Sequence, residues 1–359
     1  MNINHYKKRW ERIKALLEKE KKDAFLCSVP GNIRYLCCVH VPEFPIVHKI
    51  IIPRDDEIVA VAPSVEEFRA RKESAIKNIK IFAPYKDLEV DGKDADEVVK
   101  KELKGLGAKN ILVDTKIKIR GVKCSESEIV TEMRVHKAQH EIRKIREAVR
   151  ITKMGEEYLN EILKPGRTEL EVATDLEHFL RNNGARSVSF PTIVASGPNA
   201  AYSHYEPGER KIKKDEPVIV DFGVNYEGYC SDVTRTFILG KNRKFEKIYR
   251  IVKKAHDEAI KATKVGEKFS AIDKTAREIF RKEGLARYFV HNLGHGLGIE
   301  VHENITWNPQ SIGLATSENK VEKGNVFTVE PGLYLPGEGG VRIEDDIYVA
   351  GKSVLVLTK

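Results

Sequence analysis

The sequence predicts an α+β protein of two domains, and three observations support this. The chain has 359 residues, enough for two domains of roughly 100–200 residues each. Short apolar runs alternate with helical patterns in residues 1–131, which indicates a smaller N-terminal α/β domain. Residues 132–359 open with long helical patterns and continue mainly as strands and loops, which indicates a larger second domain.

Composition and charge exclude several classes of protein. No apolar run approaches the roughly 18 residues of a membrane span, and the basic N-terminus leads into no apolar segment, so neither a membrane protein nor a secretory signal is expected. The net charge is +8, but lysines and arginines alternate with glutamates, as in 100–109 and 140–150. We therefore expect no nucleic-acid partner. The five cysteines include no CxxC pair and are expected to be reduced, in a cytoplasmic protein.

The N-terminal domain is predicted as helices alternating with the strands of a mixed sheet. Residues 6–21 have helical periodicity, with Ile13, Leu16 and Leu17 on one face. Apolar runs that predict strands follow at 23–29, 48–53, 57–63, 79–84 and 110–115. The domain contains no phosphate loop and no acids at catalytic spacing, so we expect an architectural role.

The second domain is predicted to begin with two helices. A charged helical stretch starts near residue 136 and ends at Lys164-Pro-Gly. Thr168 and Glu171 form a capping box that opens the next helix, which runs to about Asn183. Strands and loops follow, interrupted by a helix pair near 245–283.

The most informative segment is residues 217–239, where two β-rich runs flank a turn candidate at 225–228. A symmetric turn would place Val224 opposite Tyr229, and Asp221 opposite Asp232. Like charges directly opposite each other destabilise a sheet. A proton, a basic side chain or a bound cation must then compensate.

A second acidic pair is predicted in residues 326–349. Residues 336–340 are turn-forming, and a loop centred on Gly337 would place Glu330 opposite Glu344. One such pair could be an edge device or a surface accident. Two pairs, both within apolar strands, favour cation ligands.

Histidines in glycine-rich loops add a nitrogen ligand to these acids. His291 and His295 are four residues apart, but Gly294 and its neighbouring glycines favour a tight turn over a helix. One imidazole and four carboxylates match the charge of two divalent ions such as Mn²⁺, Fe²⁺, Co²⁺ or Zn²⁺. Two such metals generate a hydroxide at neutral pH and polarise a carbonyl, which is aminopeptidase chemistry.

Over essentially the whole chain, these residues resemble the pita-bread metallopeptidases, the group of creatinase, prolidase and methionine aminopeptidase. The family's metal pentad is matched by Asp221, Asp232, His295, Glu330 and Glu344. The resemblance implies a C-terminal pita-bread domain after a creatinase-like N-terminal domain, and two divalent metal ions, with manganese or cobalt favoured. It also implies that Asp221 binds one metal, that His295 and Glu330 bind the other, and that Asp232 and Glu344 bridge the two.

The same resemblance implies roles for the residues around the metals. Thr234 and Arg342 match supporting positions beside the ligands, each two residues from one of them and therefore on the same strand face. Substrate-handling histidines of the family correspond to His204, His291 and His302, whose imidazoles could donate to a developing oxyanion. Glu330 would also carry a proton from the attacking water to the leaving nitrogen.

The two-domain length resembles the Xaa-Pro branch of the family, which implies a peptide substrate with proline at the second position. Xaa-Pro dipeptides (prolidase activity) are the first expectation, and homodimers are common among relatives. Residues 302–310, HENITWNPQ, lack the basic residue with which family dipeptidases grip the substrate carboxylate. Cleavage of longer peptides, as by aminopeptidase P, therefore stays open. Methionine or general aminopeptidase activity, or a non-catalytic binding module, are further alternatives.

Overall fold

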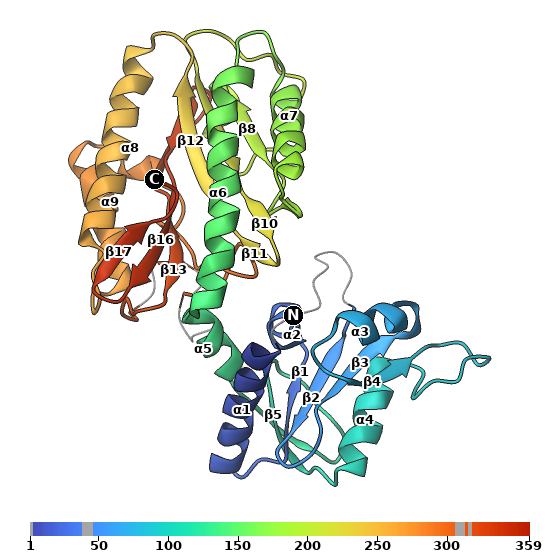
Figure 1. Ribbon diagram of the computed structural model, residues 1–359. Coiled ribbons are helices and arrows are strands. Elements are labelled where there is room, and N and C mark those ends of the chain that lie inside the picture. The colour runs from blue at the N-terminus through green and yellow to red at the C-terminus, as the bar shows by residue number, and fades with distance from the viewer. Residues whose placement is uncertain (1–2, 38–45, 306–312, 315–317) are drawn as a thin grey trace. The chain divides into compact units, whose positions relative to one another are not determined.

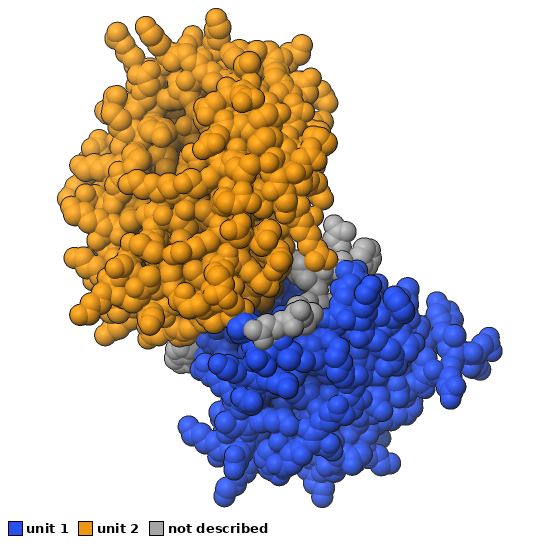
Figure 2. Space-filling model, in the orientation of Figure 1, with its two compact units in different colours: residues 1–134 blue, residues 135–359 orange. Residues whose placement is uncertain are grey.

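The computed structural model describes residues 3–37, 46–305, 313–314 and 318–359. The chain forms two compact units, Met1–Arg134 and Val135–Lys359, which are coloured separately in Figure 2. The division falls at the end of helix α5 (Ile129–Val135), close to the predicted boundary between residues 131 and 132. Within the described residues, no helix combines the length and apolar character needed to cross a membrane.

The first unit is built on a six-stranded mixed sheet with the strand order β4-β3-β2-β1-β5-β6. The strands are β1 (Ala24–Cys27), β2 (Lys49–Pro53), β3 (Val59–Pro63), β4 (Asn78–Phe82), β5 (Asn110–Val113) and β6 (Lys123–Glu126). Five of them overlap the apolar runs that predict strands, whereas β6 is polar and has no such signal. β1 pairs antiparallel with β2 and parallel with β5, so the predicted mixed sheet is confirmed.

Helices pack around this sheet (Figure 1). They are α1 (Asn4–Lys19), α2 (Pro30–Cys37), the short 3-10 helix η1 (Ser64–Glu66), α3 (Glu67–Glu73), α4 (Ala95–Gly105) and α5. Ile13 and Leu17, from the predicted apolar face of α1, are fully buried. The side chain of Asp94 caps α4 by accepting a hydrogen bond from the Glu97 amide at 2.8 Å.

In the second unit, the first pair of helices packs against one three-stranded sheet. The helices are α6 (Gln139–Ile162) and α7 (Glu169–Asn182), and the sheet has the order β12-β9-β8. Its strands are β8 (Ile193–Ser196), β9 (Pro217–Phe222) and β12 (Val233–Ile238), with the small strands β7 (Ser187–Val188), β10 (Val224–Tyr226) and β11 (Tyr229–Cys230) beside them. The capping box of α7 is confirmed, with reciprocal Thr168 and Glu171 bonds of 2.8 and 3.1 Å.

A second helix pair repeats this arrangement further along the chain. Helices α8 (Arg243–Ala262) and α9 (Phe269–Lys282) lie side by side in Figure 1, as predicted for 245–283. They share a core with residues of the C-terminal sheets, such as Phe327 and Ile347. These strands are β13 (Val326–Val329), β14 (Gly332–Leu335), β15 (Gly339–Arg342), β16 (Asp345–Ala350) and β17 (Ser353–Val356). The 3-10 helices of this unit are η2 (Gly197–Ala201) and η3 (Ala286–Tyr288).

The two halves of the second unit are built alike, down to single backbone hydrogen bonds. Before α7, the Gly166 amide donates to the Ile212 carbonyl at 2.8 Å; before α9, the Gly266 amide donates to Val321 at 2.9 Å. After the acceptor residue, Ile212 or Val321, the chain enters a strand: β9 in the first half and β13 in the second. Each half therefore brings one strand, and one hairpin, to the centre of the unit.

The first predicted acidic pairing is wrong in its register. In the β9–β12 ladder Thr234, and not Asp232, lies opposite Asp221. Likewise Val224 exchanges bonds with Ser231 rather than Tyr229. The cause is the turn, because Glu227 and Gly228 both have positive φ, 45° and 87°, and form a two-residue connection.

The second predicted register is confirmed. Gly332 pairs with Arg342 in β14–β15, and Val329 pairs with Asp345 in β13–β16. Glu330 and Glu344 lie between these two ladders and follow the same register. The predicted loop centre, Gly337, has a positive φ of 75° and joins β14 to β15.

Candidate metal centre and substrate cavity

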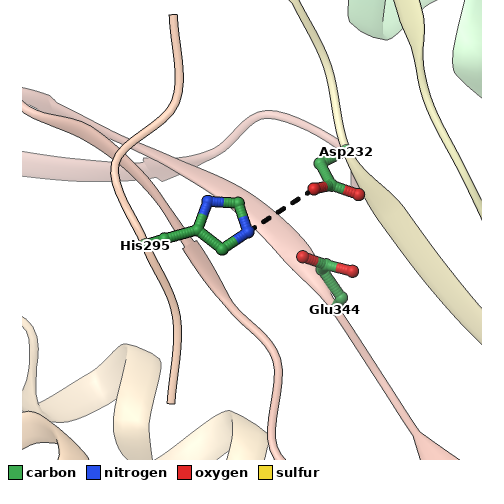
Figure 3. Close-up of side chains that lie close together, drawn as sticks. All are labelled: Asp232, His295 and Glu344. Carbon is green, nitrogen blue, oxygen red and sulfur yellow. Dashed lines mark ion pairs between the residues drawn. The ribbon is translucent and has the colours of Figure 1, made fainter. Parts of the chain in front are cut away.

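Three buried side chains from different elements meet at the centre of the second unit. Asp232 directly precedes β12, Glu344 lies between β15 and β16, and His295 comes from the loop that runs along β13. Their ligand atoms lie within 4.8 Å of one another, and the side chains point toward each other in Figure 3. His295 Nε2 is 3.6 Å from Asp232 Oδ2. This group is a possible metal site.

The other two predicted ligands line the same cavity but lie outside this three-residue group. Glu330 Oε1 is 3.4 Å from His295 Nε2, so the structure brings it to the imidazole. Asp221 Oδ2 instead accepts a hydrogen bond from Arg342 Nη2 at 2.5 Å. Its second oxygen, Oδ1, is buried and has no hydrogen-bond partner among the described residues.

Crowding and burial change the proton affinity of these acids. Burial raises the pKa of Glu330 to about 8. Burial and then repulsion from neighbouring carboxylates raise the pKa of Asp232 and of Glu344 well above their ordinary range. Without a cation, several of these carboxyl groups are favoured in the protonated state.

The protonation state and orientation of the His295 imidazole suit a metal ligand. Burial, followed by the nearby His302, lowers its pKa to about 3, so it is neutral at physiological pH. Its Nδ1 lies 3.1 Å from the Gly296 carbonyl, which can only accept a hydrogen bond. The Nε2 lone pair is therefore free to face the acids, as metal-binding histidines require.

A cation fits this donor set. Among the described residues, the buried oxygens Asp221 Oδ1 and Asp232 Oδ1 have no hydrogen-bond partner. A buried carboxylate oxygen without a partner is costly unless a cation or water satisfies it. Carboxylates with one neutral imidazole are also the ligands that divalent transition metals accept. The residues thus agree with a divalent metal site.

Thr234 and Arg342 connect the ligands to one another. Thr234 Oγ1 donates to Glu344 Oε2 at 2.6 Å and accepts from Arg342 Nε at 2.9 Å. Arg342 also holds Asp221, so one buried guanidinium orients acids from both halves of the unit. This is the arrangement expected of groups that fix metal ligands in place.

The centre lies at the wall of a cavity of about 730 Å³. The predicted histidines His204, His291 and His302 all line it, together with the apolar side chains of Phe190, Pro191 and Ile193. The ring centroids of His302 and His295 are 4.1 Å apart, and burial lowers the pKa of His302. Imidazoles, acids and an apolar wall therefore share one chamber.

Tyr334 was not expected from the sequence, yet it links two residues that were. Its hydroxyl accepts from Arg342 Nη1 at 2.8 Å and lies 2.8 Å from His291 Nε2. The other His291 nitrogen lies 2.6 Å from the Asn292 carbonyl, so both ring nitrogens are engaged. Strand alternation could have identified Tyr334, because it lies four residues after Glu330 and therefore on the same face.

Lys137 and Glu303 form a second unexpected feature. Lys137 Nζ lies 2.9 Å from Glu303 Oε2, and both side chains are almost fully buried. Glu303 Oε1 also accepts the Ile299 amide at 2.8 Å, inside the loop between His295 and His302. No local signal marks this pair, because its partners are far apart in the sequence.

The segment 302–310, which lacks the basic residue of family dipeptidases, lies partly outside the described residues, from 306 onward.

Comparison with known proteins agrees with this geometry. The model of metallopeptidase family M24 matches residues 143–350. An uncharacterised peptidase from Staphylococcus epidermidis is 35% identical over 355 residues, 97% of this chain and 98% of that protein. A prolidase structure from Pyrococcus horikoshii OT3 is 30% identical with a TM-score of 0.85, covering 98% of both chains. An X-Pro aminopeptidase structure from Thermotoga maritima MSB8 is 29% identical with a TM-score of 0.85, covering 98% of this chain and 97% of that one. The predicted pita-bread architecture is thereby confirmed, and the chain belongs to metallopeptidase family M24.

Proposed function

We propose that this protein hydrolyses the peptide bond between an N-terminal residue and proline. Two divalent cations would be held by Asp221, Asp232, His295, Glu330 and Glu344. The observation that carries the proposal is the buried Asp232–His295–Glu344 group in the wall of a cavity, where the carboxylate oxygens Asp232 Oδ1 and Asp221 Oδ1 have no hydrogen-bond partner among the described residues. The similarity to prolidase and X-Pro aminopeptidase structures supports the Xaa-Pro bond as the target.

Each cavity residue has a role in this reaction. Bound divalent cations would polarise the scissile carbonyl and provide a nucleophile at neutral pH. Glu330 takes a proton from the attacking water at its carboxylate and passes it to the proline nitrogen.

The remaining lining residues orient the peptide. His204 and His302 line the cavity and can donate to the substrate carbonyl or to the developing oxyanion. His291, whose nitrogens contact Tyr334 and Asn292, fixes the position of Tyr334 beside Arg342. Phe190, Pro191 and Ile193 exclude water and provide apolar contact for the proline ring.

Xaa-Pro dipeptides are the first candidate substrates, with His204 as the group that meets their free carboxylate. A specific observation favours longer peptides as the second candidate. Among the described residues that line the cavity, Arg342 is the only lysine or arginine, and its guanidinium already forms an ion pair with Asp221. The sequence from 304 to 317 also contains no Lys or Arg. A longer peptide needs no basic side chain at this point, because its chain continues past proline and has no free carboxylate there.

An Asp232→Asn variant tests the metal-dependent mechanism. It keeps the size of the side chain but removes the negative charge, so we expect Xaa-Pro hydrolysis and bound metal to be lost together. The measurements are initial rate and metal content by mass spectrometry, with two ions per chain expected in the wild type and at most one in the variant. Asp257→Asn, on the exposed surface of α8, is the matched control. Full activity of Asp232→Asn would refute the proposed mechanism.

A cytoplasmic homodimer remains a prediction that accompanies this function. A dimer would sediment at twice the chain mass of 40.7 kDa. Sedimentation velocity at micromolar concentration measures this, and a single species at the chain mass would contradict the dimer.

A further inference from the structure

A fully buried glutamate begins helix α7. Glu169 is the first residue of that helix and has no exposed surface. At the corresponding start of α9, in the repeated half of the unit, stands Phe269. Phe269 is also fully buried and packs edge-on against Phe327 at 5.2 Å between ring centroids. Because an apolar ring occupies this position in one half, the fold itself does not require a charge in the other.

Within the described part of the chain, the hydrogen bonds that the Glu169 carboxylate accepts all come from one segment, residues 196–205. Its Oε1 accepts the Ser196 amide at 2.8 Å and the Ser196 hydroxyl at 2.6 Å. Its Oε2 accepts the Tyr205 hydroxyl at 2.9 Å. Asn199 Nδ2 lies 3.1 and 3.2 Å from the two oxygens and donates to the Tyr205 hydroxyl at 2.6 Å. The glutamate therefore gathers the beginning, middle and end of this segment.

This segment forms one wall of the substrate cavity. Ser203, His204 and Tyr205 all line the cavity. The Ser203 carbonyl accepts Arg342 Nη1 at 3.0 Å, which connects the segment to the ligand network. Burial raises the pKa of Tyr205 to about 12, so its hydroxyl remains a donor to Glu169 across the physiological pH range.

We infer that Glu169 is a positioning residue that fixes the substrate-facing segment 196–205, and with it His204 and Tyr205, for recognition of the peptide. This inference rests on the proposed Xaa-Pro hydrolysis. Each group that contacts the Glu169 carboxylate donates a hydrogen bond to it, so the site needs two acceptor oxygens. Glutamine offers one acceptor and places an NH₂ group against a donor. A glutamine variant thus keeps the shape while breaking part of the network.

The test compares Glu169→Gln with Glu171→Gln, two residues along the same helix. Glu171 is an exposed member of the capping box, and glutamine fulfils the same capping role. We would measure kcat and KM on Met-Pro and Met-Pro-Gly with Mn²⁺, hydrogen exchange of residues 196–205, and metal content. For Glu169→Gln we expect KM to rise about tenfold and exchange in 196–205 to quicken about tenfold, on the scale of one or two lost buried hydrogen bonds. We expect kcat within about threefold and metal content unchanged, because none of the hydrogen bonds described for the Glu169 carboxylate involves a proposed metal ligand.

Tyr205→Phe provides a second variant that removes a single hydroxyl from the network. It should raise KM in the same direction but by less. Unchanged KM and exchange in Glu169→Gln would overturn the inference, as would faster exchange throughout the unit, which would mark a merely structural role. If the wild type cleaves neither peptide, the proposed function is wrong. The exchange comparison then decides alone whether Glu169 fixes the segment.

Discussion

The guanidinium of Arg342 lies 2.5 Å from a carboxylate oxygen of Asp221, and this ion pair is buried at the edge of the candidate metal centre. Asp221 belongs to β9 in one half of the second unit, and Arg342 to β15 in the other. The pair therefore joins the two halves where the acids are most crowded. The other oxygen of Asp221, Oδ1, is buried without a hydrogen-bond partner among the described residues.

Removing this guanidinium should destabilise the protein. In Arg342→Met, Asp221 would be left as an uncompensated buried charge, which costs about 3–5 kcal/mol when one partner of a buried pair is lost. Urea unfolding in chelator measures the free energy of unfolding without a metal contribution. Lys244→Met is the matched control, because its pair with Glu338 is about half exposed and should contribute no more than about 1 kcal/mol. Equal losses in the two variants would contradict this account of Arg342.

The buried pair of Lys137 and Glu303 should also be sensitive to loss of one partner. Lys137→Met leaves the Glu303 carboxylate buried beside the loop of His295 and His302, and we expect a loss of about 3–5 kcal/mol. Thermal or urea unfolding measures it. The exposed pair of Lys268 and Glu318 is the control, and Lys268→Met should leave the free energy of unfolding nearly unchanged because solvent screens this pair. A Lys137 variant as stable as that control would show that the pair contributes nothing.

Gly223 separates β9 from β10 at a point of close backbone contact. A Cβ atom there would lie 1.9 Å from the carbonyl oxygen of Ser231, the residue before Asp232. Gly223→Ala should therefore cost about 1–3 kcal/mol or more through overpacking and should displace Asp232. Gly105→Ala is the opposite case, because nothing lies within 4 Å of its added Cβ at the end of α4. We expect it to be neutral or stabilising by up to about 1 kcal/mol. Urea unfolding measures both variants, and a similar loss of stability in Gly105→Ala and Gly223→Ala would contradict this steric argument.

His291 should make stability depend on pH between about 4 and 6.5. Burial, followed by the charge of Arg342, lowers its pKa to about 4, whereas an unfolded histidine titrates near 6.5. As the pH falls through this window, the unfolded chain binds a proton that the folded protein does not, so stability decreases. In His291→Asn this contribution is absent, and the slope of unfolding free energy should be smaller by up to about 1.4 kcal/mol per pH unit. Urea titrations of both proteins in chelator measure the difference, and identical slopes would contradict it.

The sequence predicts much of this fold where local chemistry is decisive. The capping box of Thr168 and Glu171 marks the start of α7, and Gly337 marks the turn that brings Glu330 across from Glu344. The register predicted for the hairpin at 225–228 is wrong because nothing in its sequence shows that Glu227 adopts a left-handed conformation. The tighter turn displaces Asp232 from its predicted position opposite Asp221.

The candidate site divides in the same way. The residues of the Asp232–His295–Glu344 group stand out in sequence, because acids in apolar strands and a histidine among glycines are unusual. The residues that support them do not. Lys137 resembles any surface lysine before a helix, and Glu169 resembles an ordinary acid in a first helical turn. Their burial depends on contacts between distant segments, which a periodic pattern does not encode.

The most direct measurement is the initial rate of hydrolysis of Met-Pro and Met-Pro-Gly, with Mn²⁺ or Co²⁺ and with chelator. We expect cleavage before proline that chelator abolishes. Faster dipeptide cleavage would indicate prolidase activity, and faster tripeptide cleavage would indicate the aminopeptidase activity that the missing basic residue favours. Cleavage of neither peptide with either metal, or a rate that chelator leaves unchanged, would contradict the account.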